Sequence, residues 1–274
     1  MLDLKSHLLF SLAFSIPENE SVQHPSDVFS SAAQRLLTYP ELQWRLFDFS
    51  PNSIRSAVST MQQQGLVVTV QQAGKIFIRM TAAGREHLFS SLPETVFKKK
   101  KWDAAWRLAI FSNVRYAPES LYAYRTLRNL LRTHGFVSLE RAVYISPYPI
   151  GEKLKNELMR AKVMGLFVFL ESKRFLIGDE REFCRSVWNL DERAKDYTKL
   201  SKLTTSLLSV VQKEKALNDG RKHQYSRLSS DLFSLLARDP DLPTQVLGAQ
   251  FPHVACVQEY LRLSTVVFSL DRSH

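Results

Sequence analysis

The stretch SPNSIRSAVSTMQQQGL, residues 50–66, decides the fold predicted for the first part of this chain. Ser50 followed by Pro51 is a common helix start, because serine caps the free amides and proline fits the first helical position. Gly65 is placed to end the helix. Apolar residues recur between them at helical spacing and predict a buried face, made of Ile54, Ala57, Val58 and Met61.

The opposite face of this helix carries side chains that can read base pairs. It has almost no net charge but many hydrogen-bond donors and acceptors, from Asn52, Ser53, Arg55, Ser56, Ser59, Gln62 and Gln63. An arginine on such a face can bind guanine through two hydrogen bonds, so Arg55 is the foremost candidate. Two alternatives stay open: an ordinary solvent-exposed helix, and an Arg55 side chain held in a salt bridge to Glu41 or Asp48.

A β-hairpin is predicted directly after the helix. LVVTV and IFIRM read as two short strands around a tight Ala73-Gly74 turn, with Lys75 and Arg79 on the hairpin. Further helices are expected at 4–16, 26–37 and 41–49, and another after Thr81. Helices followed by a hairpin describe a winged helix-turn-helix, so residues 1–93 are predicted to bind double-stranded DNA, with Lys75 and Arg79 as wing contacts.

Composition limits the classes of protein to which the chain can belong. At 274 residues and 45% hydrophobic content, it can bury one large core or two to three smaller ones. Its apolar runs are shorter than the roughly 18–20 residues that a membrane span needs, and its start reads as a helix rather than a signal peptide. Two distant cysteines, Cys184 and Cys256, are typical of buried thiols in a reducing compartment. We therefore expect a cytoplasmic protein with no membrane partner.

The positive charge is concentrated in the middle third of the chain. The formal net charge is +10. Residues 1–93 hold 7 basic and 7 acidic side chains, residues 94–178 hold 16 and 7, and residues 179–274 hold 14 and 13. A basic segment attracts nucleic-acid phosphate whatever the base sequence, although a merely solvated surface stays an alternative. The run at 94–101 reads as an exposed linker whose lysines are candidate phosphate contacts: Lys98, Lys99, Lys100 and Lys101.

The middle segment, residues 102–178, alternates strands and helices. Helices are predicted at 118–135 and 149–165; strands are predicted at 106–113, 136–147, 166–170 and 174–178. This β-α-β-β-α-β order is the ferredoxin-like plan, in which two helices cover one sheet face and the bare face needs a partner. The first helix carries a row of arginines on one face, which are candidates for contacts to phosphate in DNA or in an effector, or are simply solvated: Arg125, Arg128 and Arg132.

The last segment, residues 179–274, is predicted to be all helical. Helices are expected at 191–215, 221–237 and 252–269, and the prolines of DPDLP, 239–243, exclude a helix there. The fold class predicted for the whole chain is α+β, with a winged helix-turn-helix, a ferredoxin-like domain and a helical C-terminal domain.

The whole chain resembles the PaaX family of bacterial transcriptional repressors, named for control of phenylacetic acid breakdown. The stretches that carry the resemblance occur in the expected order: NSIRSAVSTMQQQGL, KIFIRMTAAG, WRLAIF, LRNLLRTHGFVSLERAVYISP, WNLDERAKDY and DPDLPTQVLGAQFP. The resemblance implies a homodimer whose middle domain, similar to the small ferredoxin-fold nuclease of CRISPR spacer acquisition, serves dimerisation. It also implies an acyl-CoA effector, because family members are relieved by phenylacetyl-CoA.

Two departures from the family pattern bear on function. The family's recognition helix usually has Arg-Leu where this chain has Thr60-Met61, so its operator preference is expected to differ. The nuclease relatives keep an aspartate where this chain has Ser112-Asn113, and a carboxylate is what holds the divalent metal there. Cleavage by that route is therefore not expected.

The sequence contains no recognisable catalytic arrangement. It has no GxSxG, HExxH, Walker loop or dinucleotide glycine fingerprint, and its seven histidines are scattered. Cys184 beside Arg185 could be an activated thiol, although an inert buried cysteine is the commoner case. No catalytic residue, cofactor or metal is expected. The predicted function is operator binding by a dimer, with a metal-dependent nuclease or a non-specific nucleic-acid scaffold linked to CRISPR or mobile elements as alternatives.

Overall fold

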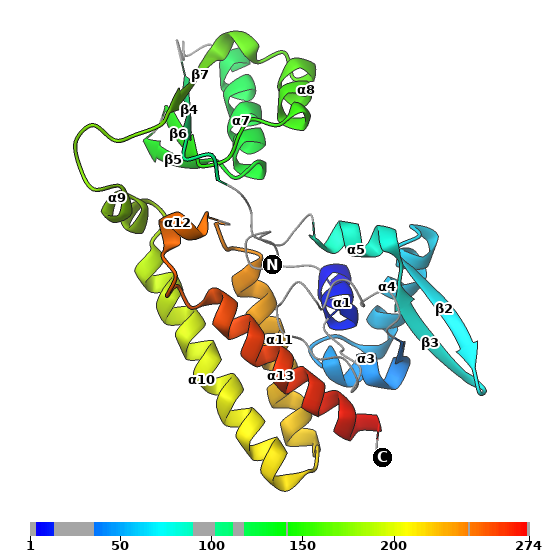
Figure 1. Cartoon of the computed structure of the whole chain (residues 1–274). Helices are drawn as coiled ribbons and strands as arrows, with labels where there is room; N and C mark the ends of the chain where they lie inside the picture. The colour runs from blue at the N-terminus through cyan, green and yellow to red at the C-terminus, as the bar shows by residue number, and fades with distance from the viewer. Residues whose placement is uncertain are drawn as a thin grey trace. The chain divides into compact units, whose positions relative to one another are not determined.

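The computed structural model describes residues 4–13, 36–89, 102–111, 118–140, 142–240 and 242–272. Helices and two antiparallel sheets make up this part of the chain, which confirms the predicted α+β class (Figure 1). The chain divides into two compact units, which we describe separately. Unit 1 comprises Met1–Lys99, Arg193–Asp239 and Phe251–His274, and unit 2 comprises Lys100–Glu192 and Pro240–Gln250. Unit 1 thus combines parts of the first and last predicted segments, and the predicted boundaries stay a prediction.

Unit 1 begins with helix α1 (Leu4–Ala13), in which Leu8, Leu9 and Leu12 are fully buried. Strand β1 (Leu37–Thr38) and helix α3 (Tyr39–Arg45) follow the segment 14–35, which lies outside the described residues. The prediction of a helix through Leu37 is wrong at that residue, because Leu37 is extended and pairs with Ile78. Thr38 explains the change: its side chain caps α3, so that Tyr39-Pro40 begins the next helix.

The helix and hairpin predicted from residues 50–66 onward are confirmed. Helix α4 covers Pro51–Gln63, strand β2 covers Val67–Gln72, strand β3 covers Lys75–Met80 and helix α5 covers Ala82–Phe89. The turn lies at Ala73 and Gly74, both with positive φ. The sheet order is β1-β3-β2 and all its pairs are antiparallel. Thr81 caps α5, since its Oγ1 accepts a hydrogen bond from the Gly84 amide at 3.0 Å.

Long helices complete unit 1 and share its hydrophobic core. Helix α10 covers Leu190–Glu214, of which the part from Arg193 belongs to unit 1; α11 covers Asp219–Leu236 and α13 covers His253–Arg272. They lie side by side (Figure 1) and are joined by buried contacts such as the stacked rings of Tyr225 and Tyr260. One core cluster contains side chains of α1, α4, the hairpin and these helices together.

Unit 2 is a four-stranded antiparallel sheet with helices on one face. Its elements follow the order β4 (Trp106–Phe111), α7 (Pro118–Thr133), β5 (Val137–Glu140), β6 (Val143–Ser146), α8 (Glu152–Arg160), the short 3-10 helix η2 (Met164–Leu166) and β7 (Phe167–Ser172). The strand order in the sheet is β5-β6-β4-β7. Leu127 and Leu131 of α7 and Leu154 and Leu158 of α8 are buried in the core beneath the sheet.

The segment after β7 does not form the predicted strand at 174–178. The chain there is irregular, and Leu176 and Ile177 are 81% and 94% exposed. The apolar sequence RFLIG suggested a strand, but only Phe175 packs, against Trp106 and Phe183. Helices α9 (Glu180–Val187) and α12 (Thr244–Leu247) complete this unit.

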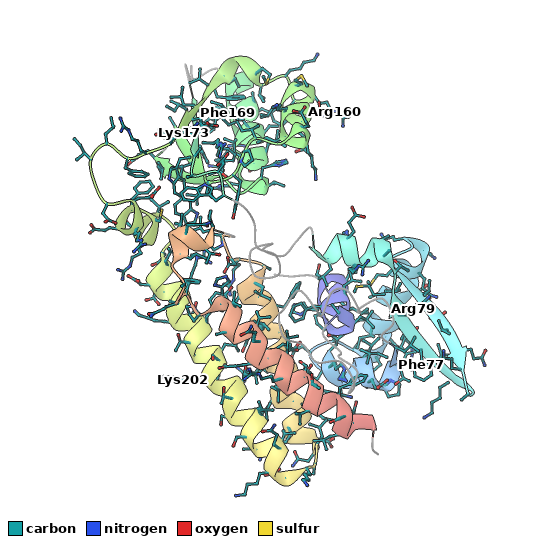
Figure 2. The ribbon with its side chains drawn as sticks, viewed as in Figure 1. Phe77, Arg79, Arg160, Phe169, Lys173 and Lys202 are labelled. Atoms are coloured by element: carbon teal, nitrogen blue, oxygen red, sulfur yellow. The ribbon has the colours of Figure 1, made fainter. Side chains whose placement is uncertain are left out.

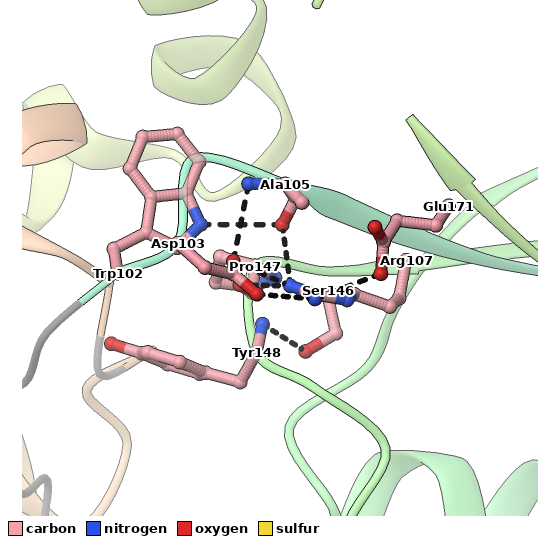
Figure 3. Close-up of polar contacts among 8 residues, drawn as sticks. All are labelled: Trp102, Asp103, Ala105, Arg107, Ser146, Pro147, Tyr148 and Glu171. Atoms are coloured by element: carbon pink, nitrogen blue, oxygen red, sulfur yellow. Dashed lines mark hydrogen bonds and ion pairs between the residues drawn. The ribbon is translucent and has the colours of Figure 1, made fainter. Parts of the chain in front are cut away.

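A buried arginine fixes the start of β4 in unit 2 (Figure 3). The Arg107 side chain is 7% exposed, and its guanidinium pairs with Glu171 of β7 at 2.9 Å and with both carboxylate oxygens of Asp103. It also donates to the carbonyl oxygens of Ala105, at 2.9 Å, and Pro147, at 3.4 Å. This clamp joins β4, β7 and the turn after β6, and it lowers the pKa of Asp103, mainly through the hydrogen bond from Arg107.

Gly84 in helix α5 allows this helix to approach the backbone at Leu66 closely. A Cβ atom on Gly84 would lie 2.0 Å from the Leu66 carbonyl oxygen. We expect Gly84→Ala to lower the free energy of unfolding by about 1–3 kcal/mol, because the helix must move away from the hairpin entry. Chemical denaturation measures the difference. Gly220→Ala is the matched control: its Cβ makes only an ordinary contact in α11, and the variant should be as stable as the wild type or more stable. Equal effects of the two changes would contradict the close packing.

The Asp103–Arg107 pair predicts that the stability of unit 2 depends on pH. Because the folded pKa of Asp103 is lowered from 3.8, its stabilisation is present above that pH and is lost as the pH falls through the lower folded value. We expect Asp103→Asn to cost about 1 kcal/mol at pH 7, and the difference from wild type to shrink below pH 4. Denaturation followed by the unit 2 tryptophans in a Trp44→Phe background measures it. Glu152→Gln, at a solvent-exposed pair with Lys155, should have little effect at either pH.

Candidate nucleic-acid interface

The interface is built on helix α4, whose start is fixed by serines. Ser50 is extended and caps the helix: its Oγ accepts a hydrogen bond from the Ser53 amide at 3.1 Å. The two serine hydroxyls are 2.8 Å apart and share a second hydrogen bond. Pro51 occupies the first turn, as the sequence predicted.

The apolar and polar residues of α4 lie on opposite faces of the helix, as predicted. The apolar face is buried, with Ile54, Val58 and Met61 at most 1% exposed. The opposite face is exposed to solvent at every predicted DNA-contacting position: Asn52, Ser53, Arg55, Ser56, Ser59, Gln62 and Gln63. The helix therefore presents a continuous polar surface.

Arg55 is available for an external partner. Its Nη1 donates to the Asn52 side-chain oxygen at 3.4 Å, a long bond at the exposed surface. In the part of the chain that the structure describes, no carboxylate pairs with Arg55, so the alternative salt bridge to Glu41 or Asp48 does not form. Glu41 is instead occupied at the start of α3, where it accepts hydrogen bonds from the Thr38 amide at 2.6 Å and the Thr38 hydroxyl at 2.7 Å.

Gln62 has a role that the sequence did not reveal. Its Nε2 donates to the Thr69 hydroxyl on β2 at 2.9 Å. This bond ties the last turn of α4 to the hairpin, so Gln62 is less free to reach a base than Ser56 or Ser59. The periodicity of α4 placed Gln62 on the polar face correctly, but a partner seven residues away on another element leaves no signal in that pattern.

Lys75 and Arg79 are both exposed on β3, on one face of the hairpin. Ile78 and Met80, whose side chains point to the other face of the strand, are buried in the core that contains α4. Lys75 adjoins the turn, whereas Arg79 lies farther along the strand (Figure 2). Lys75 is thus the basic residue nearest the tip of the hairpin in this strand.

The arginine row belongs to unit 2, on helix α7. Arg125 and Arg132 are exposed, and Arg128 is half-buried. The Arg128 Nε atom is buried without a hydrogen-bond partner among the described residues. The lysines at 98–101 and the Ser112-Asn113 pair lie outside the described residues, so their predicted roles stay predictions.

The thiols and the metal-ligating side chains give no catalytic arrangement in the described part of the chain. Cys184 and Cys256 are free and fully buried, and burial raises the pKa of each thiol to about 12. Arg185 therefore does not activate Cys184. Within the described ranges, no group of three or more His, Cys, Asp or Glu residues could hold a metal ion, and no helix could span a membrane.

Comparison with known proteins identifies the central unit. Residues 99–184 match the family model of the PaaX protein central Cas2-like domain. This match covers the strands and helices of unit 2 from β4 to β7 and extends into α9. This part of the chain is thus similar to the central domain of PaaX proteins, and the resemblance to the PaaX family seen in the sequence is confirmed.

A solved structure shares the fold over most of the chain. It is the uncharacterized protein Rv0674 from Mycobacterium tuberculosis, with a TM-score of 0.51 and 16% sequence identity. The match covers 89% of this chain and 94% of that chain. No curated protein matches the chain. At this identity the likeness concerns the fold alone.

The Ser50 cap yields a stability prediction for the interface helix. We expect Ser50→Ala to cost about 1 kcal/mol of unfolding free energy, because the Ser53 amide loses its hydrogen-bond acceptor. Ser59→Ala, on the exposed face of the same helix, should stay within about 0.5 kcal/mol of the wild type. Urea denaturation followed by circular dichroism measures both. A Ser59 variant as unstable as the Ser50 variant would show that the cap has no special role.

Proposed function

We propose that this protein is a sequence-specific DNA-binding transcriptional regulator, and in particular a repressor. The observation that carries the proposal is the exposed polar face of α4, which presents Arg55 and several serines beside a hairpin that carries Lys75. A PaaX-type central domain in the same chain is in line with a regulatory rather than a catalytic role.

The arrangement of α3, α4 and the hairpin supports a winged helix-turn-helix. In that fold the second helix of the pair enters the major groove and the hairpin contacts the adjoining backbone. Here α4 takes the place of the recognition helix, and β2 and β3 that of the wing. We assign Asn52 and Ser53 to phosphate or base contacts near the helix start, Ser56 and Ser59 to base edges, and Gln63 to the last turn.

Unit 2 supports the dimer that a palindromic operator needs. Its element order and its sheet order β5-β6-β4-β7 are those of a ferredoxin-like domain. Val168 and Leu170 on β7 are 50% and 52% exposed and lie on the sheet face opposite the helices. We propose that a second copy covers this face, which places two α4 helices in half-sites a helical turn or a multiple apart.

Release by an effector completes the proposed mechanism. The PaaX resemblance implies an acyl-CoA, whose phosphates would need cations such as Arg125, Arg128 and Arg132 or the lysines at 98–101. Such an effector lowers operator affinity only if it binds better to a conformer in which the two α4 helices no longer match the half-sites.

Arg55 provides the test of sequence-specific binding. We expect Arg55→Ala to lose about 1–3 kcal/mol of binding free energy on fragments that the protein selects from its own genome, and less on random DNA of equal length. Titration of labelled fragments at fixed salt measures both affinities. Arg262→Ala, which removes an exposed arginine of α13 in the same unit, is the matched control and should bind like the wild type.

The same titrations separate the alternatives. Equal losses on selected and random DNA would make Arg55 a phosphate contact. Equal wild-type affinity for both would favour a non-specific scaffold over a repressor. Cleavage of the fragments in the presence of magnesium would favour a nuclease and contradict the proposal.

A further inference from the structure

A cleft of about 520 Å³ lies beside the hairpin in unit 1. Lys75 and Phe77 reach it from β3, Trp44 from α3, Lys222 from α11 and Asp271 from α13. Its size falls within the range of about 300–1,000 Å³ that small-molecule sites occupy. It is lined by both the proposed wing and the C-terminal helices, and the function proposed above makes no use of it.

The walls of the cleft suit a flat apolar group. The rings of Trp44 and Phe77 line it, together with Pro40 of α3. The side chain of Phe77 is half-buried and projects from the hairpin (Figure 2). Aromatic rings beside polar and charged groups are typical of sites for small ligands that have a planar body and a polar end.

The acidic groups of the cleft are already occupied. Asp271 accepts a hydrogen bond from the Trp44 indole at 3.2 Å and pairs with Lys222 at 3.4 Å and with Arg45 at 3.7 Å. Glu41 caps α3 through its bonds to Thr38. These carboxylates therefore leave little negative charge for a cationic ligand.

Counted together with the neighbouring Arg45, the basic groups at the cleft exceed the acidic ones by one. Arg45 does not line the cleft but is buried next to it, with its guanidinium 4.1 Å from the centre of the ring of the lining residue Trp44. Its Nε and Nη1 atoms have no hydrogen-bond partner among the described residues. Lys75 is exposed at the mouth, and no acid in the described ranges pairs with it. The two lining lysines, Lys75 and Lys222, balance the two lining carboxylates, Glu41 and Asp271. Arg45, stacked on the lining residue Trp44, adds one positive charge that a monoanion would neutralise.

We propose that this cleft binds a small organic monoanion with a flat apolar body, such as an aromatic carboxylate, and that the bound anion weakens DNA binding. The regulatory part rests on the function proposed above. Lys75 follows the Ala73-Gly74 turn directly, so an anion paired with it removes the charge that the wing offers to phosphate. The ligand also links the hairpin to α11. By thermodynamic linkage, bound DNA must lower the affinity for the anion by the same factor by which the anion lowers the affinity for DNA.

The first experiment measures the site without DNA. The probes are 1-naphthoate and its neutral counterpart 1-naphthamide, titrated into the full chain by calorimetry. We expect saturable naphthoate binding and at least about tenfold weaker amide binding, because only the acid pairs with the lysines. Lys75→Gln and Lys222→Gln should each weaken naphthoate binding about tenfold. Lys202→Gln, at an exposed lysine of α10 (Figure 2), should leave it unchanged.

Two results would overturn the site. One is equal binding of acid and amide in the wild-type chain, a comparison that does not depend on the folding of any variant. The other is the absence of saturation at millimolar naphthoate. An unchanged affinity in Lys75→Gln would also contradict the assignment, because this exposed lysine has no structural partner in the described ranges whose loss could mask the effect.

The second experiment measures regulation. Saturating naphthoate should lower the affinity of the wild type for a selected DNA fragment by about fivefold or more, whereas Lys75→Gln should respond little. Naphthoate binding with unchanged DNA affinity would refute the coupling. A chain that binds naphthoate but no DNA would refute the proposed function while supporting the anion site.

Discussion

The structure of unit 1 depends on the burial of one edge of α4 in a core that both ends of the chain build. Ile54, Val58 and Met61 are inaccessible to solvent and share a single cluster with side chains of α1 and of the long C-terminal helices, such as Leu263 and Val267. Burying each such side chain is worth about 1.5–3 kcal/mol. Because α4 and α13 contribute to the same cluster, the helix that presents Arg55 is not an independent module, and residues more than 200 positions away in the sequence help to build the core in which it is buried.

Polar contacts join α3, α11 and α13 at the edge of that core. Asp271 joins Trp44 and Arg45 of α3 to Lys222 of α11, and the Ser226 hydroxyl donates to the Arg45 carbonyl oxygen. A buried arginine with a long ion pair and two unpaired nitrogens is a costly arrangement for stability alone. Arg45 stacks on Trp44, which lines the cleft at the hairpin, so an anion bound there as we propose would be stabilised by its charge.

Local features of the sequence were predictable, and contacts between distant residues were not. The Ser-Pro start and the 3.6-residue spacing located α4 to within a residue, and the Ala-Gly pair located the turn, because caps and turns depend on neighbouring residues. Leu37 was misplaced because pairing with Ile78 overrode its helical context. RFLIG looked like a strand, but β7 already forms the edge of the sheet and leaves the segment unpaired. The core that the N-terminal and C-terminal helices share, and the Gln62–Thr69 hydrogen bond, join residues far apart in the sequence or on different elements. Such contacts leave no periodic pattern in the sequence.

The distribution of charge along the chain is in line with the proposed function, in which α4 contacts bases and the basic middle segment attracts phosphate. The exposed face of α4 has a single charged residue, Arg55, among neutral hydrogen-bonding side chains, whereas residues 94–178 carry an excess of nine basic residues. Base edges are recognised by directional hydrogen bonds, and phosphates by charge alone. A strongly basic α4 would bind any duplex and lose discrimination, because phosphate attraction is independent of sequence. Under the proposed function, placing the charge elsewhere in the chain would leave the choice of duplex to the serines and Arg55 of α4.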